Sequence, residues 1–471
     1  MLVLLRYEFI LVALIVIFLL AWLIPGKSED RSLSLFWINV LLFINFLFGF
    51  IPVEEGVLFN NMFYTNEAIG VQKMLLNFGA LIISLQAYDW LKSNRNAFEF
   101  YLLLISTLLG MFFMISARNL LMLYVGLEMA TLPLAALAAF ETDSKRSAES
   151  GIKLILNSVL SSAIFLFGLA LLYGETGSLH FSDMAGKLTG NPDGYRDTTL
   201  SLLLVFTGFG FKISIVPFHL WTADVYEGAP VSITSYLSVI SKSSVVFVFI
   251  SFLYIALKNM APLWIPFLMV TSVLTMTLGN IFALRQQNMK RFLAFSSIAQ
   301  AGYILIGILG ASALGMSSVI FFVLIYIFSN LGAFGVVSVI SAQTGKENLD
   351  DYKGMYHTNP MLSLLLLLSM FSLAGVPPTA GFFGKLFMLM AAAGKGYYIL
   401  ILIAALNMII SLYYYLRIIK SMFMDKSESP IAYFRSSIYS RIALVICFAG
   451  IILTGFFSGI FDYFYSISFG I

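Results

Sequence analysis

The sequence predicts an all-α, polytopic membrane protein with about fourteen transmembrane helices, and three observations support this. Only 11% of the 471 residues are charged, 60% are hydrophobic and the mean hydropathy is +0.93, whereas a typical soluble domain has about 25% charged residues. Apolar runs recur along the chain at close to the 20-residue length that spans a bilayer. No polar stretch between these runs is long enough to fold as a domain of its own.

The apolar runs predict helices in the following order. They fall at residues 8–25, 35–52, 72–91, 98–116, 118–140, 152–174, 199–222, 230–257, 262–284, 292–312, 315–343, 360–392, 396–416 and 438–465. The first run is interpreted as a transmembrane helix rather than a signal peptide, because it is long and lacks a small-residue cleavage site. The longest polar stretches are predicted to be loops, at residues 53–70, 175–198, 345–359 and 421–437.

Loop charges predict the orientation. Loops that follow odd-numbered helices carry seventeen cations and the opposite loops carry seven, namely Arg6, Lys73, Arg118, Lys187, Arg196, Lys258 and Lys395. Since cytoplasmic loops of membrane proteins are enriched in Lys and Arg, both termini are predicted to lie on the outer side of the membrane.

Composition excludes several function classes. The net charge of +3 is too small to indicate a nucleic-acid partner. The single cysteine, Cys447, allows no disulfide framework, iron–sulfur site or zinc site, and His180, His219 and His357 are far apart in sequence. Gly-rich phosphate loops and a nucleophile elbow are both missing from the sequence. We therefore expect no cofactor and no metal in this chain.

The seventh predicted helix contains a buried charge beside a break. Lys212 lies well inside an apolar run, where a charge costs roughly 2.5–3.5 kcal/mol even on lenient insertion scales. Pro217 follows five residues later and removes a helical hydrogen bond, and Gly208 and Gly210 weaken the turns before it. Broken helices in membranes are tolerated where they are buried in protein or line a wet cavity, and they are typical of ion pathways.

The twelfth predicted helix repeats this arrangement. Pro377 and Pro378 break an apolar run, and Lys385 follows two helical turns after Pro378, on the same face as the break. Two broken helices five helices apart predict two inverted five-helix repeats. The resulting divisions are an N-terminal three-helix segment at 1–97, the repeats at 98–257 and 258–420, and a last helix at 421–471.

Four ionisable residues lie inside predicted helices and form a candidate proton path. Glu128 is at the middle of the fifth helix and is expected to pair with Lys212, and Lys242 and Lys385 extend the series on helices eight and twelve. Separating a buried Glu–Lys pair lowers the lysine's affinity for its proton by desolvation. Hydroxyl side chains on the eighth helix are candidate path-lining groups: Ser232, Thr234, Ser235, Ser238, Ser241, Ser243 and Ser244.

Each of these residues also has a structural interpretation. The three lysines could snorkel, Glu128 could be a satisfied structural carboxylate, His219 a core histidine, and the prolines simple kinks. The hydroxyls of the eighth helix could be small-residue packing positions. Lys153, near the inner end of the sixth helix, could be an anchor or a supporting member of the path.

The motifs resemble those of a known family. Asp224-Val-Tyr-Glu227-Gly-Ala-Pro230 followed by Tyr236-Leu-Ser-Val-Ile-Ser-Lys242 resembles the antiporter-like membrane subunits of respiratory complex I, and within them subunit N of bacterial NADH:quinone oxidoreductase, the counterpart of mitochondrial subunit 2. Further matches span about residues 90–420. They are Gly126-Leu-Glu128-Met, Ser147-Ala-Glu149-Ser-Gly-Ile-Lys153, Lys290-Arg-Phe-Leu-Ala-Phe-Ser-Ser297-Ile-Ala-Gln-Ala-Gly302-Tyr303 and Leu373-Ala-Gly-Val-Pro-Pro378-Thr-Ala-Gly-Phe-Phe-Gly-Lys385.

The resemblance implies a proton-translocating subunit without redox chemistry of its own. It implies that Glu128, Lys212, Lys242 and Lys385 carry the path and that Lys153 supports it. NADH, FMN, iron–sulfur clusters and quinone are expected in other subunits. The implied partners are the membrane subunits M and K as neighbours, then A, H, J and L, together with the lipid bilayer. The implied location is the bacterial cytoplasmic (inner) membrane.

The chain departs from the family at Gln300, which stands where many members have a histidine before Gly-Tyr. Glutamine cannot titrate, so it could only order water in the path. An Mrp-type cation/proton antiporter subunit, a hydrogenase-linked proton pump and a purely structural scaffold remain alternatives.

Overall fold

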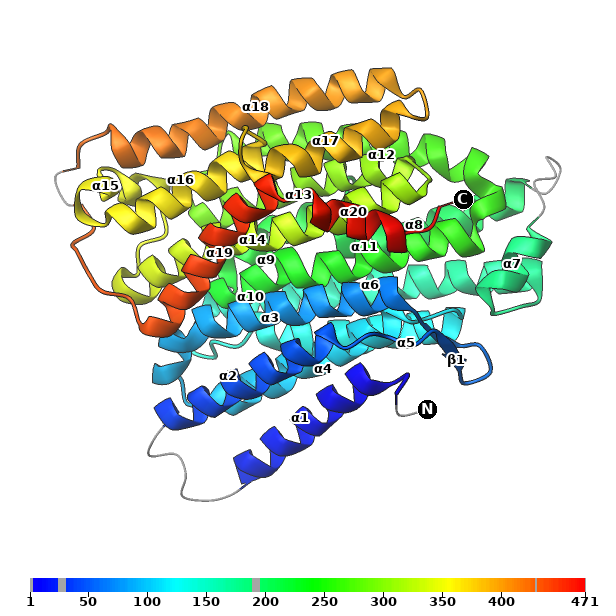
Figure 1. Cartoon of the computed structure of the whole chain (residues 1–471), viewed down its shortest axis with the longest axis horizontal. Helices are drawn as coiled ribbons and strands as arrows, with labels where there is room; N and C mark the ends of the chain where they lie inside the picture. The colour runs from blue at the N-terminus through cyan, green and yellow to red at the C-terminus, as the bar shows by residue number, and fades with distance from the viewer. Residues whose placement is uncertain (1–2, 24–30, 189–194, 428–429, 471) are drawn as a thin grey trace.

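The computed structural model is a bundle of long, roughly parallel helices, with α1 and α2 at one edge and α18 at the opposite edge (Figure 1). It describes residues 3–23, 31–188, 195–427 and 430–470. Its first half contains α1 (Arg6–Leu23), α2 (Arg31–Leu47), β1 (Gly56–Leu58), β2 (Phe63–Thr65), α3 (Glu67–Ser93), α4 (Ala97–Ile115), α5 (Leu120–Ala138), α6 (Lys145–Thr176), α7 (Phe181–Lys187), α8 (Tyr195–Ile213), α9 (Leu220–Gly228), α10 (Val231–Tyr236) and α11 (Lys242–Ser251). Its second half contains α12 (Ala261–Ala283), α13 (Met289–Leu309), α14 (Ala313–Thr344), α15 (Met355–Thr358), α16 (Pro360–Ala374), α17 (Ala380–Ala393), α18 (Tyr398–Phe423), α19 (Ile438–Phe456) and α20 (Gly459–Ile467).

The number of membrane crossings agrees with the sequence. Within the described residues, twelve helical segments are long and apolar enough to span a membrane. Two further crossings consist of shorter helices in pairs, α8 with α9 and α16 with α17. The prediction of about fourteen transmembrane helices is therefore confirmed. The predicted end of the first helix at residue 25 and the loop cation Lys27 lie outside the described residues.

The predicted loops contain short elements of their own. Within the stretch predicted as the loop 53–70, β1 pairs antiparallel with β2, and this hairpin bonds to the turn between α4 and α5 through Tyr64 N to Ser116 O, 2.9 Å, and Arg118 N to Met62 O, 2.9 Å. The loop predicted at 175–198 holds α7. These elements are too short to form domains, so the prediction of no soluble domain is unaffected.

The centre of the bundle is formed by α13 and α14. The apolar window of α13 is 100% buried and that of α14 is 94% buried, because α14 packs against α3, α16, α17 and α19 while α13 packs against α12, α17 and α9. Helices that are apolar on all faces are expected in such positions. Lys212, Lys242 and Lys385, on helices around this centre, are each at most 9% exposed and lie within the protein.

Both ends of the described chain lie at the same end of the bundle (Figure 1), as an even number of crossings requires. Which side of the membrane this end faces stays a prediction from the loop charges.

One predicted loop cation is wrongly placed. Lys73 is 0% exposed, and its Nζ binds Glu8 Oε1 at 2.6 Å and Ser116 Oγ at 2.6 Å. The reason is the start of α3, which begins at Glu67 with the Asn66 side chain capping Ile69 N at 2.9 Å, five residues before the predicted start. Moving Lys73 inside leaves six cations in the outer loops, seven minus one, so the charge asymmetry is retained.

We expect Glu8→Gln to lower the free energy of unfolding by about 3–5 kcal/mol, because it leaves the buried ammonium of Lys73 without a countercharge. The double variant Glu8→Leu/Lys73→Met removes both charges and should recover most of this loss. Thermal unfolding of the purified protein in detergent would measure both, with the exposed Lys92→Met as the control. Equal losses in the single and double variants would contradict the pairing.

Candidate functional site

The first helix break separates α8 from α9. Helix α8 ends at Ile213, Ser214 adopts a left-handed backbone conformation with φ of 65°, and α9 starts at Leu220 after Pro217. A neighbouring helix stabilises the break, since Val216 N donates to Thr275 Oγ1 of α12 at 3.0 Å. The chain thus fixes an irregular segment inside the bundle, one residue beyond the turn that carries Lys212.

Lys212 is held by hydroxyl groups and not by the predicted carboxylate. Its Nζ donates to Thr131 Oγ1 of α5 at 2.7 Å and to Ser158 Oγ of α6 at 2.7 Å. Among the described ion pairs Glu128 has none, and its buried Oε1 has no hydrogen-bond partner. The structure therefore shows no direct Glu128–Lys212 contact, although the Glu128 carboxylate still acts on the Lys212 ammonium through space. Thr131, one turn from Glu128 on α5, occupies the place of the carboxylate.

Lys242 lies at the centre of the bundle, immediately after a π-helical turn at Leu237–Ser241. Such turns widen a helix and are frequent at functional sites. The side chain is 4% exposed, and its Nζ donates to Ser297 Oγ of α13 at 2.7 Å. No acidic residue of the described chain pairs with it. This ammonium is consequently buried with a neutral hydroxyl oxygen as its hydrogen-bond partner.

The second break, between α16 and α17, carries Lys385. Gly375, with φ of 85°, ends α16, and Pro377 and Pro378 follow. The spacing of two helical turns after Pro378 predicts that Lys385 faces the break. Its Nζ does point there, since it donates to Leu373 O at 2.7 Å and to Ala374 O at 3.2 Å. Leu373 and Ala374 are the last residues of α16, so Lys385 of α17 binds orphan carbonyls at the C-terminus of α16, where the negative end of that helix dipole lies.

Gln300 connects this break to α13. Its Nε2 donates to Leu373 O at 2.9 Å, so one carbonyl accepts from both Gln300 and Lys385. Ser297, which binds Lys242, lies one turn before Gln300 on the same helix. Helix α13 thus brings Lys242 and Lys385 to adjacent turns of one buried scaffold.

Two buried polar groups near Lys242 lack a well-formed hydrogen bond. The ring nitrogens of His219, which is 5% exposed, and the hydroxyl of Tyr226 make no well-formed hydrogen bond. Weaker polar contacts run from His219 to the Pro217 backbone and from Tyr226 to Ser297 and Ser238. The Tyr226 ring lies 5.6 Å from Lys242 Nζ. Since buried polar groups rarely lack partners, these atoms indicate positions for water between the first break and Lys242.

Three of the seven hydroxyl groups predicted on the eighth helix, those of Thr234, Ser235 and Ser244, donate to backbone carbonyls. Ser235 donates to Val231 O at 2.9 Å and Ser244 to Ser241 O at 2.7 Å. Ser238 is different, because it bonds to Asn330 and Tyr326 of α14 at 2.6 and 3.2 Å. The hydroxyls that bind Lys212 and Lys242 come from α5, α6 and α13, and no sequence pattern singled them out as lysine partners.

Lys153 lies apart from the buried lysines, in an ion cluster at the rim of the bundle. It is 39% exposed and pairs with Glu149 at 2.7 Å and Asp224 at 2.9 Å. Arg291 completes the cluster, at 2.6 Å from Asp224 and 3.0 Å from Glu227. This arrangement favours the anchoring interpretation of Lys153.

A second polar feature at the same end was not predicted. Lys290, counted as a loop cation, is 6% exposed, pairs with Glu347 at 3.1 Å and donates to Ala229 O at 3.2 Å. A cavity of about 380 Å³ surrounds this pair and reaches Pro230 and Ser232. It lies next to the segment that carries Tyr226.

In the described residues, no group of three or more His, Cys, Asp or Glu side chains is placed to hold a metal ion.

The family model described as NADH:quinone oxidoreductase/Mrp antiporter, transmembrane region, matches residues 117–411. Curated relatives named NADH-quinone oxidoreductase subunit N are 44% identical over 95% of this chain and 94% of the relative in Phocaeicola vulgatus, and 47% identical over 88% and 87% in Azobacteroides pseudotrichonymphae.

The chain belongs to the NADH-quinone oxidoreductase subunit N family. A chain in a solved structure titled respiratory complex I from Thermus thermophilus with bound Aureothin agrees with this assignment. It is 31% identical with a TM-score of 0.78, and the match covers 96% of this chain and 97% of that one. The family resemblance inferred from the motifs is therefore confirmed over the whole bundle, including both broken helices.

We expect Lys153→Gln to lower the stability of the assembled NADH-quinone oxidoreductase by less than about 1 kcal/mol, because exposed ion pairs contribute about 0.2–1 kcal/mol. Raising the ionic strength should reduce even this difference. Thermal unfolding at low and high salt would measure it. A loss as large as that expected for Glu8→Gln would contradict the placement of Lys153 at an exposed rim.

Proposed function

We propose that this chain is a membrane-arm subunit of an NADH:quinone oxidoreductase and moves protons through buried lysines while quinone is reduced elsewhere in the complex. The names and near full-length coverage of its relatives support the assembly. The observation that carries the mechanism is the environment of Lys212, Lys242 and Lys385. Each is buried, and its hydrogen bonds go to hydroxyls or carbonyls.

Such lysines are suited to proton transfer. A buried ammonium bound by neutral oxygens is less stable than one with a carboxylate, because desolvation favours the uncharged amine. A small electrostatic change can then move the proton to or from the site. For scale, moving one charge against 100 mV costs about 2.3 kcal/mol.

We infer the order of the path from the contacts and charges of its members. Glu128 modulates Lys212, Lys242 carries the proton at the centre, and Lys385 connects to the outer side or a neighbouring subunit. Water at the ring nitrogens of His219 and the hydroxyl of Tyr226 would join the first two lysines, and Gln300 would join the last two through Leu373 O. Pro217, Pro377 and Pro378 contribute by interrupting the two helices near Lys212 and Lys385.

We assign the access from the inner side to the cavity around Lys290 and Glu347. Its wall includes Pro230 and Ser232, in the connection that follows Tyr226. Tyr226 directly precedes Glu227, which lines the cavity, and its ring is 5.6 Å from Lys242 Nζ, so it is our candidate link between the cavity and Lys242. The ion pair at the cavity would control whether water there is continuous with the path.

The division into two inverted five-helix repeats, at 98–257 and 258–420, is also a proposal. It is supported by the third helix of each proposed repeat, α6 and α14. Each has 32 residues, begins after a serine N-cap and ends at a glycine in the left-handed region. The breaks follow in the next helix of each unit.

Glu128 suggests where a neighbouring subunit binds. It is half-buried, and its neighbours on α5, Val125 and Leu132, are 47% and 53% exposed. Since a carboxylate at the membrane midplane needs a partner, we propose that an adjacent complex I subunit covers this face. Subunits K and M are the expected neighbours, and both termini are expected on the periplasmic side of the bacterial inner membrane.

The redox chemistry is assigned to other subunits, which would hold FMN, iron–sulfur clusters, NADH and quinone. An Mrp-type antiporter or a hydrogenase-linked pump is the second candidate, because the matching family model covers Mrp antiporters too. The subunit N relatives favour the first candidate. Sodium-dependent transport in vesicles without NADH would favour the second.

We expect Lys242→Ala to abolish proton uptake and to reduce NADH oxidation strongly in inverted membrane vesicles, because the central proton acceptor is lost. Both rates should be measured together, after a native gel has established that the complex assembles. Lys395→Ala is the matched control, since Lys395 is exposed outside the buried series. Undiminished pumping in an assembled Lys242→Ala complex would contradict the proposed path.

A further inference from the structure

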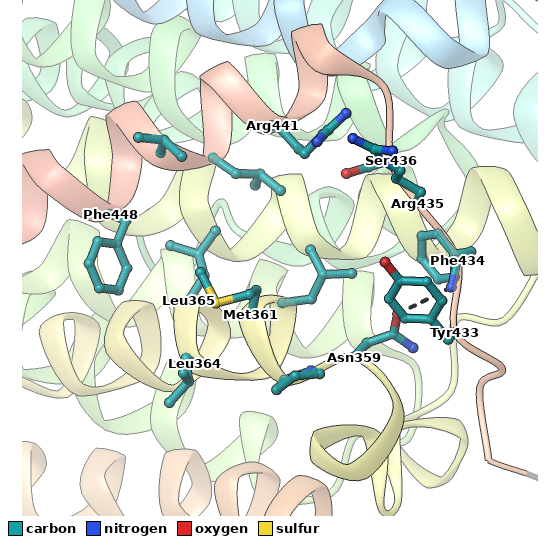
Figure 2. A pocket seen from close by; sticks show the side chains of 14 residues that line it. Asn359, Met361, Leu364, Leu365, Tyr433, Phe434, Arg435, Ser436, Arg441 and Phe448 are labelled. Atoms are coloured by element: carbon teal, nitrogen blue, oxygen red, sulfur yellow. Dashed lines mark hydrogen bonds between the residues drawn. The ribbon is translucent and has the colours of Figure 1, made fainter.

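A groove lies between the start of α16 and the start of α19, and its two ends differ in chemistry (Figure 2). Its volume is about 380 Å³. Met361, Leu364 and Phe448 line the apolar end, while Arg435 and Arg441 gather at the other (Figure 2). The groove thus combines an acyl-chain-sized apolar wall with two guanidinium groups.

The apolar wall faces outward from the bundle. Met361 is 78% exposed, Val445 is 64% exposed and Phe448 is 40% exposed. In a membrane-spanning protein such side chains meet lipid or another protein. A groove on this surface is therefore open to the bilayer along its length.

The polar end is built by a buried side chain. Asn359 is 4% exposed, and its Nδ2 donates to Ile431 O at 3.3 Å and Ala432 O at 3.2 Å. Its Oδ1 accepts from Phe434 N at 3.5 Å. These bonds hold the irregular segment before α19 against the start of α16, and Arg435 is the next residue along that segment.

The two arginines are available to bind an anion. None of the described carboxylates lies within ion-pair distance of Arg435 or Arg441. Arg441 Nε donates to Ser437 O of its own first turn at 3.4 Å, which leaves its terminal nitrogens for another acceptor. Guanidinium groups match the geometry of phosphate oxygens and bind them with two parallel hydrogen bonds.

We propose that this groove binds an anionic phospholipid, with the headgroup phosphate on Arg435 and Arg441 and an acyl chain along Met361, Leu364 and Phe448. The charge pattern selects this occupant, since basic pockets between transmembrane helices bind anionic headgroups. The groove opens at the end of the bundle that holds the cation-rich loops, where a headgroup of that leaflet would lie. The proposal requires only that the chain spans a membrane and is independent of the proton path.

The test is native mass spectrometry of the intact purified complex after exchange into phosphatidylglycerol or phosphatidylcholine. Arg435→Gln/Arg441→Gln should retain one phosphatidylglycerol fewer than the wild type and bind it about thirtyfold more weakly. This corresponds to about 2 kcal/mol at about 1 kcal/mol per basic residue. Lys92→Gln/Lys426→Gln removes two exposed cations from the same end and should retain the wild-type number.

Leu364→Trp is a second variant that fills the groove and keeps both arginines. It should also lose one phosphatidylglycerol, and neither groove variant should change the retention of phosphatidylcholine. Unchanged phosphatidylglycerol retention in both groove variants would overturn the proposal. Loss of a protein subunit in place of a lipid would overturn it too, because it would identify the occupant as a neighbouring chain.

Discussion

The arrangement of this bundle depends on one constraint, which is that a buried ammonium needs hydrogen-bond acceptors and here receives neutral ones. Thr131 and Ser158 serve Lys212, and Ser297 serves Lys242. These acceptors satisfy the geometry of the lysine without the strong countercharge that would fix its proton. The contrast is Lys73, whose carboxylate partner Glu8 makes it a structural clamp between α1 and α3.

The two broken helices meet this constraint in different ways. At the second break, interruption of the helix frees carbonyls inside the membrane, and Lys385 uses them as its acceptors. At the first break, the hydroxyl of Thr275, on the neighbouring helix α12, fixes the irregular backbone by accepting from Val216 N. Each break is thus stabilised by the side chains around it, and α13 lies close enough to bond to the second through Gln300.

The positions of the lysines and breaks could be predicted because a charge or a proline inside an apolar run is a local signal. Their partners could not, because hydroxyl residues are common in these helices and helix packing decides which of them meets a lysine. For that reason the sequence analysis names Ser297 only as part of a motif, and it expects Glu128, not Thr131, to be the partner of Lys212. Lys73 was misplaced because Asn66 caps α3 earlier than the apolar run begins, and its partner is 65 residues away.

The most direct test of this account is the proton uptake per NADH oxidised in vesicles that carry Ser297→Asp, compared with Ser297→Thr. The aspartate would give Lys242 a carboxylate at the position of its present hydroxyl partner, 2.7 Å away. If neutral acceptors are what allow the proton to move, the assembled Ser297→Asp complex should stop pumping, while Ser297→Thr should pump normally. Full pumping in the assembled Ser297→Asp complex would contradict the account.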